Sequence, residues 1–395
     1  MLEAHSGVVL GFVDFPRKPP TWTRFRADPL ADPRSALERS LGRCLAAGPC
    51  TVQFSGGRDS SLVLAVAVHV ARRDGLPLPR ALAIRYLGAP EAEESEWQKF
   101  VTDHLDVPLE VITVPPGGNE IVSPLAISRL LRDGPIFPPP ASVSLARIAP
   151  AVAGTTVLTG EGGDDILGAE RISFWLGYLR ARRIPRSPDA REMVEDLTFG
   201  ALRRSVIARR INALVLTLAP WLRPHARRVV SAKWVDEVCA TPFDWRRATW
   251  QYLNFRRCLS YETMAAVAAR EGFRLEHPLM DPDFVATLCR RGGATGFPNR
   301  SHIMRLLAAD LLPDSVSRRQ TKATFNEVYV GDGVRSFARS WSGKGLDESL
   351  VDVEALRAAW SSDMIPGPSL APLQYALLDA LESGWEPTPV AELLT

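Results

Sequence analysis

Residues 50–68 read CTVQFSGGRDSSLVLAVAV. The apolar run 50–54 predicts a short strand, and the small apolar residues of 61–72 predict a helix. The stretch SGGRDSS between them is too polar for a core and too rich in glycine for a helix interior. A glycine-rich turn from a parallel strand into a helix binds anions, because backbone N–H groups and the helix N-terminus face the ligand. The stretch therefore predicts a phosphate-binding loop.

The flanking sequence alternates between strand and helix patterns. Further strands are expected at 80–86, 109–114 and 155–160, and helices at 93–105, 123–134 and 142–154. This alternation predicts an α/β fold, a parallel sheet with helices on both faces. We expect an irregular segment over 1–45 and the α/β core over 46–170. The strand signals then fade, so 171–395 is expected to be a mostly helical lobe.

The composition excludes several classes of protein. The 395 residues carry a formal net charge of +2, which gives no general attraction to nucleic acid or anionic membranes. Five cysteines without a CxxC pair predict neither a disulfide framework nor a zinc site, so a reducing, cytoplasmic setting is expected. The start lacks the layout of a signal peptide, and the apolar run 211–222 is too short for a bilayer.

One basic stretch leaves two interpretations open. Eight Lys and Arg residues and no acidic residue lie between Arg203 and Lys233. They form either a solvated helix face or a contact strip for an acidic or peptide substrate.

The loop at 55–61 is not a Walker A loop, because it lacks the Gly-Lys-Ser/Thr ending. Without that lysine, Asp59 beside a triphosphate would need Mg²⁺ between the two anions. SGGxDS resembles the pyrophosphate loop of the N-type ATP pyrophosphatase superfamily, which cleaves ATP to AMP and pyrophosphate. The resemblance implies that the loop binds the phosphates of ATP through Ser55, Gly56, Gly57, Asp59, Ser60 and Ser61.

A second stretch selects the branch of that superfamily. VLTGEGGDDILG at 157–168 resembles the S-G-E-G-x-D-E loop of the asparagine synthetase family. Three further blocks resemble that family in the same order: DGPIFPPPASVSL at 133–145, EGFRLEHPLMDPDFVATL at 271–288 and SHIMRLLAADLLPDSVSRRQTKATF at 301–325. The resemblance covers roughly 46–330 and implies the adenine nucleotide alpha hydrolase-like fold.

The family resemblance assigns roles to individual residues. It implies that Asp59 and Asp164 share Mg²⁺, because the carboxyl ends of neighbouring parallel strands meet at one crevice. The pyrophosphate-binding lysine of the family falls at Ser301, so Arg300 is expected to supply that charge. Glu161 is expected to orient or deprotonate an amine, and Lys322 to stabilise developing negative charge. The expected contacts on the adenine side are Ala83, Thr159 and Gly160.

Two departures from the family shape the expected reaction. Position 2 is Leu2 where glutamine-using members have a cysteine nucleophile, and the segment 1–45 is too short for a glutaminase domain. The amine is therefore expected to be free, on a partner, or part of the substrate. Relatives of the last kind are β-lactam synthetases and the macrolactam synthetases that cyclise lasso peptides. The TKATF ending and the Arg-rich lobe resemble the lasso-peptide branch most.

The sequence therefore predicts an AMP-forming ligase that uses ATP and Mg²⁺. It joins a carboxylate to an amine of the same small-molecule or peptide substrate, with a precursor-peptide or leader-binding protein as a possible partner. An asparagine synthetase-like ligase that uses ammonia or a small amine is the alternative. A tRNA-modifying enzyme is disfavoured by the near-neutral charge. A non-catalytic nucleotide-binding scaffold is disfavoured by the presence of Asp59, Glu161, Asp164 and Lys322.

Overall fold

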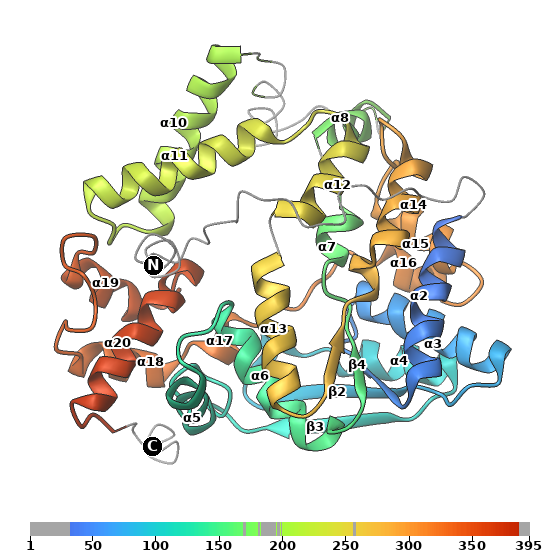
Figure 1. The fold of residues 1–395 in the computed structure, drawn as a ribbon, viewed down its shortest axis with the longest axis horizontal. Helices are drawn as coiled ribbons and strands as arrows, with labels where there is room; N and C mark the ends of the chain where they lie inside the picture. Colours follow the sequence, from blue (N-terminus) through green and yellow to red (C-terminus); the bar gives the residue numbers. More distant parts are fainter. Residues whose placement is uncertain are drawn as a thin grey trace.

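The described chain is built on a five-stranded parallel sheet, whose labelled strands lie in the lower part of the view in Figure 1. The computed structural model describes residues 32–168, 171–180, 182, 195, 198, 200–255 and 258–386. The strand order is β3-β2-β1-β4-β5, and every neighbouring pair is parallel. The strands are β1 (Cys50–Gln53), β2 (Arg80–Tyr86), β3 (Leu109–Val114), β4 (Thr156–Leu158) and β5 (Arg274–Glu276). The predicted α/β fold with a mostly helical remainder is confirmed.

Helices account for most of the other elements. Before and between β1 and β4 lie α2 (Pro33–Ala47), α3 (Arg58–Asp74), η1 (Pro90–Ala92), α4 (Ser95–Leu105), α5 (Pro124–Asp133) and α6 (Pro139–Val152). Between β4 and β5 lie α7 (Gly163–Ile166), α8 (Arg171–Arg180), α10 (Gly200–Leu218), α11 (Pro224–Ala240), α12 (Trp245–Phe255) and α13 (Cys258–Arg270).

After β5 the described chain is helical. It contains η2 (Pro278–Met280), α14 (Pro282–Gly292), α15 (Arg300–Ala308), α16 (Asp314–Arg318), α17 (Asn326–Tyr329), α18 (Asp332–Ser340), α19 (Val353–Trp360), η3 (Gly367–Ser369) and α20 (Leu370–Glu382).

Helices cover both faces of the sheet, because side chains alternate between the faces along each strand. On one face Val52, Ala81 and Leu158, which are partners in the strand register, pack with α2, α3, α14 and α15. On the other face Leu82 and Val157 pack against α6 and α13. The sheet is therefore buried between two helical layers.

The sequence analysis did not predict β5, which lies within the part expected to be helical. This strand pairs Val157 of β4 with Leu275 and extends the sheet at its edge. It is only three residues long, and Arg274 is exposed, so the alternation that marks a longer strand is absent. The stretch 171–395 is mostly helical but also completes the sheet. The proposed boundary at 170 stays a prediction.

The C-terminal helices form a second hydrophobic cluster away from the sheet. Trp221, Phe337 and Trp360 are fully buried in it, and it joins α10 and α11 to α18, α19 and α20. In Figure 1 the helices α18, α19 and α20 lie below the α10–α11 pair.

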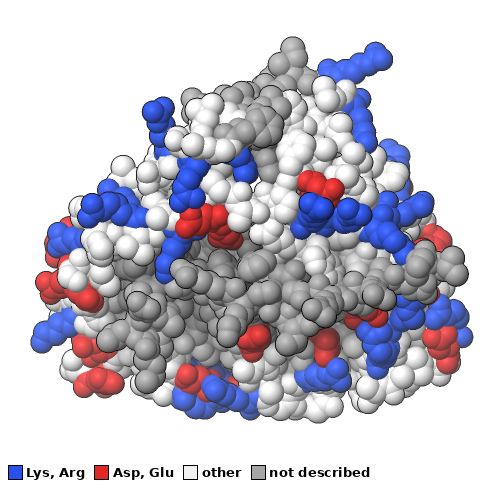
Figure 2. Space-filling view, turned by 45° about the horizontal axis from the view of Figure 1, so that its top comes forward, with Lys and Arg blue, Asp and Glu red and all other residues white. Residues whose placement is uncertain are grey.

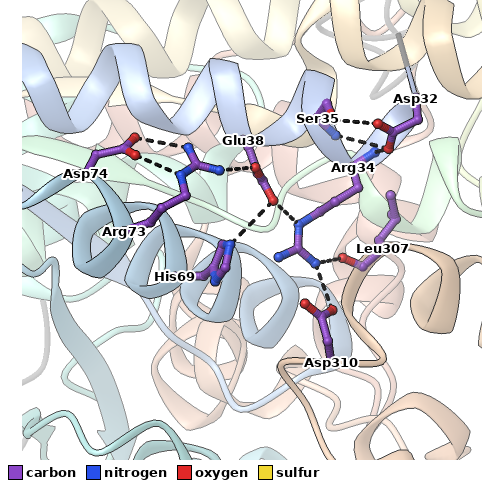
Figure 3. Close-up of polar contacts among 9 residues, drawn as sticks. All are labelled: Asp32, Arg34, Ser35, Glu38, His69, Arg73, Asp74, Leu307 and Asp310. Carbon is purple, nitrogen blue, oxygen red and sulfur yellow. Dashed lines mark hydrogen bonds and ion pairs between the residues drawn. The ribbon is translucent and has the colours of Figure 1, made fainter. Parts of the chain in front are cut away.

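A polar network fixes α2 against α3 and α15 (Figure 3). The Glu38 carboxylate of α2 accepts from Arg34 at 2.6 Å and from Arg73 of α3 at 2.5 Å. Arg34 also donates to the Leu307 carbonyl of α15 and reaches Asp310 at 3.2 Å. The network ties the C-terminal ends of α3 and α15 to one helix. The N-terminal ends of these two helices carry the residues of the candidate site.

Most charged side chains of the basic stretch have partners. Arg204 pairs with Asp236 at 2.5 Å, Arg210 with Glu195 at 2.8 Å and Arg223 with Asp352 at 3.3 Å. Figure 2 shows Asp and Glu side chains lying among the Lys and Arg side chains on that face. These pairs favour the interpretation as a solvated face. Within the described ranges, no helix is both long and apolar enough to span a membrane.

Candidate active site

The loop after β1 is held by its glycines and serines. Gly56 has φ +85°, and a side chain there would press on Gln98 and on the Glu94 carbonyl, so glycine is needed. The Ser60 hydroxyl donates to the Gly57 carbonyl at 3.1 Å and also contacts the Ser55 hydroxyl at 3.1 Å. The loop therefore enters α3 with its backbone N–H groups in a fixed arrangement.

The loop after β4 touches the first loop directly. A Cβ on Gly160 would lie 2.6 Å from the Ser60 nitrogen, and one on Gly163 would overlap the Asp59 carboxylate. Gly162 adopts φ +83° and begins the short helix α7. The strand order explains this contact, because β1 and β4 are neighbours and both loops leave the same edge of the sheet.

Two carboxylates meet on one guanidinium at this edge. Arg300, at the start of α15, donates to both carboxylate oxygens of Asp59 and to Asp164 at 2.5 Å. Lys322 also donates to Asp164. The structure thus brings together the two predicted metal ligands, the predicted phosphate-binding arginine and the predicted catalytic lysine. They come from four separate parts of the chain.

The two carboxylates have different environments. The Asp59 side chain is 17% exposed. Burial raises its pKa, and the positive charge of Arg300, which lowers the pKa, only partly offsets this. Asp164 is 49% exposed. Its burial also favours the protonated form, but hydrogen bonds and charges from Arg300 and Lys322 outweigh this and lower its pKa to about 2. Asp164 is therefore ionised at neutral pH.

The donor set fits magnesium bound together with a nucleotide. Magnesium in such sites is usually held by one or two carboxylates together with phosphate oxygens. Asp59 and Asp164 supply two carboxylates within reach of a single cationic group. The described part of the chain has no cluster of three His, Cys, Asp or Glu side chains that could hold a metal ion without a bound nucleotide.

A cavity of about 410 Å³ opens beside these residues. Of the predicted site residues, those that line it are Ser55, Gly57, Asp59, Ser60, Thr159, Gly160, Glu161, Asp164, Arg300 and Lys322. Three predicted residues are not part of its lining. Gly56 and Ser61 support the loop from behind, and Ser61 is fully buried with its hydroxyl on the Gly57 carbonyl. Ala83 faces the opposite side of the sheet from Leu82 and Ile84, which do line the cavity.

One part of the cavity lining is aromatic and rich in hydroxyl groups. Tyr86, Ser144 and Tyr329 line it, and the Ser144 and Tyr329 hydroxyls are 2.8 Å apart. Burial raises the pKa of both tyrosines, so the phenols stay neutral at physiological pH. The Tyr86 ring meets Phe325 edge to face. This part offers neutral hydrogen-bonding groups and apolar surface.

Thr159 is positioned by a buried histidine. The Thr159 hydroxyl lies 2.7 Å from Nδ1 of His277, which directly follows β5. Burial lowers the pKa of His277 to about 4, so the ring is neutral at pH 7. β5 therefore supplies support for the loop that carries Glu161.

The sequence analysis missed a buried ion pair behind the phosphate loop. Arg319 donates to the Glu94 carboxylate at 2.6 Å, to the Gly56 carbonyl at 3.0 Å and to the Thr321 hydroxyl at 2.9 Å. Its guanidinium also stacks 4.5 Å above the Trp97 ring. Both side chains of the pair are 5% exposed. Arg319 thus joins the phosphate loop to the segment that carries Lys322.

The neighbouring Gln98 completes this support by donating to the Ser55 carbonyl at 3.3 Å. One signal in the sequence could have identified Arg319. It lies three residues before Lys322 in SRRQTKATF, within the stretch 301–325 that resembles the asparagine synthetase family. Its buried partner Glu94, directly before α4, could be found only from the tertiary structure.

Comparison with known proteins agrees with this geometry. A model of the asparagine synthase family matches residues 32–373, which is most of the chain. A search of curated proteins returned no match.

Proposed function

The chain belongs to the asparagine synthase family, and from this premise we propose that it activates a carboxylate as an acyl-adenylate and closes it onto an amine of the same substrate. Family membership supports the coarser statement that the protein is an ATP-dependent, amide-forming ligase. One observation carries the proposal: Asp59, Asp164, Arg300 and Lys322 converge on one cavity at the carboxyl edge of β1 and β4.

The first step forms the adenylate. A carboxylate oxygen of the substrate attacks the α-phosphorus of ATP, and the bond from that phosphorus to the bridging oxygen breaks to release pyrophosphate. The loop 55–57 and the N-terminus of α3 bind phosphate oxygens through backbone N–H groups. Arg300 offers forked donors that suit phosphate geometry. Magnesium held by Asp59 and Asp164 would supply Lewis-acid stabilisation of the leaving pyrophosphate.

The second step forms the amide. An amine attacks the acyl carbon, AMP leaves, and one proton is lost from nitrogen. Glu161 lines the cavity on the loop after β4 and would orient the amine and accept that proton. Lys322 donates to Asp164 at the cavity wall, where it would stabilise negative charge on the acyl and phosphate oxygens. The neutral hydroxyls of Tyr86, Ser144 and Tyr329 would orient the uncharged part of the substrate.

The intramolecular form of the reaction rests on the TKATF ending, which resembles the cyclising branch. The alternative is attack by ammonia or a small amine from a separate source. Both reactions share the adenylate and differ only in where the nucleophile comes from. We also place the enzyme in the cytoplasm, because Cys44, Cys50, Cys239 and Cys289 are free thiols.

The decisive experiment combines two measurements. Exchange of labelled pyrophosphate into ATP, dependent on a carboxylate substrate, tests adenylation. Mass spectrometry of the product then separates the two amine sources. Loss of one water from a single substrate without added amine supports cyclisation, and incorporation of labelled ammonia supports the alternative. Turnover that releases ADP and phosphate instead of AMP and pyrophosphate would overturn the proposed function.

A further inference from the structure

A second cavity lies at the carboxyl ends of β2 and β3. Its volume is about 190 Å³, and it shares Tyr86 with the larger cavity. Helix α17 separates the two, since Tyr329 lines the larger cavity and Val328 the smaller one. Ligands of parallel α/β sheets bind at this edge. The second cavity therefore lies beside the site where the substrate is activated.

A buried amide lines this second cavity. The Asn119 side chain is 2% exposed, and neither its Oδ1 nor its Nδ2 has a hydrogen-bond partner within the described ranges. A buried polar group without a partner costs free energy, so an amide in this state indicates a missing partner. Asn119 lacks one group that donates to it and one that accepts from it.

The adjacent carboxylate is already satisfied. Glu120 accepts from the backbone N–H of Val334 at 3.2 Å, near the start of α18. A Cβ on Gly331 or Gly333 would lie within 2.7 Å of the Glu120 carboxylate, so these two glycines allow it to pack closely. Glu120 therefore holds α18 against the cavity, and the buried Asn119 amide beside it is left without a partner.

The opening of the cavity is acidic and its walls are apolar. The exposed residues Glu327 and Asp332 lie at the opening, and Arg335 pairs with Asp332 at 2.9 Å. The walls include Val114, Pro115, Pro116 and Val328. With Glu120, three carboxylates face one arginine. The surroundings favour an occupant with an apolar body and a positive charge near the solvent.

We propose that this cavity is a subsite for a peptide segment of the substrate, in which a substrate amide pairs with Asn119 and a basic side chain lies near Glu327. The inference rests on the proposed function, because it places the substrate of the adjacent ligase site. A backbone amide offers one N–H and one carbonyl, which are the two groups that Asn119 lacks. A carboxylate ligand would satisfy only the Asn119 donor and would be repelled by the acidic opening.

The test uses the full chain and three small probes. They are N-acetyl-lysine N-methylamide, its norleucine analogue without the charge, and N-acetyl-lysine methyl ester without the C-terminal N–H. Binding is followed through the side-chain amide NMR signal of Asn119 and, in every variant, through the backbone amide signals of Gly117 and Val330, which line the same cavity. The lysine amide is expected to shift that signal, and the other two probes are expected to bind more weakly.

Asn119→Leu keeps the volume of the side chain and removes both amide groups. Two lost hydrogen bonds predict about tenfold weaker binding of the lysine amide. Because the replaced group is unsatisfied, the thermal stability of this variant is expected to be unchanged or higher, which shows that it folds. The matched control is Asn326→Leu, an exposed amide of α17 that lines neither cavity. It is expected to bind the probe as the wild type does.

The proposal would be overturned if the lysine amide bound the Asn119→Leu protein as strongly as the wild type. It would also be overturned if a saturating concentration of the probe left the Asn119 signal unchanged. That second result would mean that only solvent occupies the cavity. The readout needs no turnover. Asp59→Asn, expected to lower pyrophosphate exchange by about 10³-fold, should leave probe binding intact. If the wild-type protein binds the probe but shows no pyrophosphate exchange, the ligase activity is refuted and the subsite is supported.

Discussion

The loops after β1 and β4 carry the same kind of side chain in opposite environments. Asp59 lies in the first turn of α3, directly after a loop held from behind by Arg319 and Gln98, and it is largely buried against Arg300. Asp164 lies at the opening of the cavity, half exposed, with Arg300 and Lys322 as partners. One carboxylate is fixed within the protein, and the other is accessible to ligands that arrive from solvent.

Under the proposed function, this difference gives the two loops separate tasks. A rigid phosphate loop gives the nucleotide one binding geometry, which is what in-line displacement requires. Because Asp164 is accessible, its cationic partners Arg300 and Lys322 can exchange it for phosphate oxygens when a triphosphate arrives. The same division applies to the cationic residues, since Arg319 is buried behind the first loop and the Lys322 side chain is 72% exposed. Substitutions in the two regions should therefore change different measured quantities.

The largest effect is expected at Asp59. Asp59→Asn removes a predicted magnesium ligand and leaves Arg300 with one carboxylate partner. We expect pyrophosphate exchange to fall by about 10³-fold, as for loss of a group that acts on the transition-state charge. Asp164→Asn should cost less, because its site is more solvated. Equal losses in the two variants would contradict the contrast between the loops.

Lys322→Ala should separate catalysis from stability. The exposed ion pair with Asp164 contributes about 0–1 kcal/mol, so the melting temperature should change little. The rate of amide formation should fall by about 10²-fold because the developing charge loses a donor. Single-turnover measurements of amide formation would show this. A variant as fast as the wild type would exclude Lys322 from the site.

Arg319→Met should affect the fixed region through stability and nucleotide binding. Removing one member of a buried pair leaves Glu94 unpaired and is expected to cost about 3–5 kcal/mol of unfolding free energy. The double variant Arg319→Met with Glu94→Gln should recover part of that loss. Chemical denaturation measures both changes.

The same substitution also tests whether Arg319 positions the phosphate loop. In the stabilised double variant the KM for ATP should stay raised, because the Gly56 carbonyl has lost its donor. If stability recovers and the KM for ATP returns to the wild-type value, Arg319 has only a structural role.

The pH dependence of stability should report on His277. Its pKa is lowered by burial from 6.5 to about 4, so the unfolded chain binds the proton more tightly. Stability is therefore complete above about pH 6.5 and is lost as the pH falls towards 4, by a total of order 3 kcal/mol. His277→Asn, which retains a polar contact for Thr159, should flatten this part of the profile. An unchanged profile would contradict the assignment.

The smallest effect is expected at Asp164 under acid conditions. Its pKa is lowered to about 2 by Arg300 and Lys322, so its contribution is present above about pH 4 and is lost as the pH falls towards 2. Exposure to solvent limits this contribution. Asp164→Asn should slightly reduce the loss of unfolding free energy between pH 4 and 2. This reduction should be smaller than the one that His277→Asn causes between pH 6.5 and 4. A larger reduction for Asp164→Asn would contradict the expected order of the two effects.

Local sequence patterns were enough to predict β1, β2, β3 and β4 and both glycine loops. The strand bounds at 80–86 and 109–114 agree with the structure, because alternation and turn residues act over a few neighbours. Both glycine loops are recognisable from their composition alone. A side chain on Gly160 or Gly163 would collide with Ser60 or Asp59, and one on Gly56 would press on Gln98. Two short stretches were therefore enough to predict where the candidate site lies.

Only the tertiary structure decided which distant residues complete the site. β5 is too short to carry a periodic signal, yet it holds His277 against Thr159. Arg319 and Glu94 are charged residues that sequence patterns place on surfaces, and long-range packing buries them as a pair. Ala83 was expected to contact the nucleotide, but the pleat of β2 gives that position to Leu82 and Ile84. Pairing and burial between segments far apart in the chain depend on the whole fold, which local residue patterns do not encode.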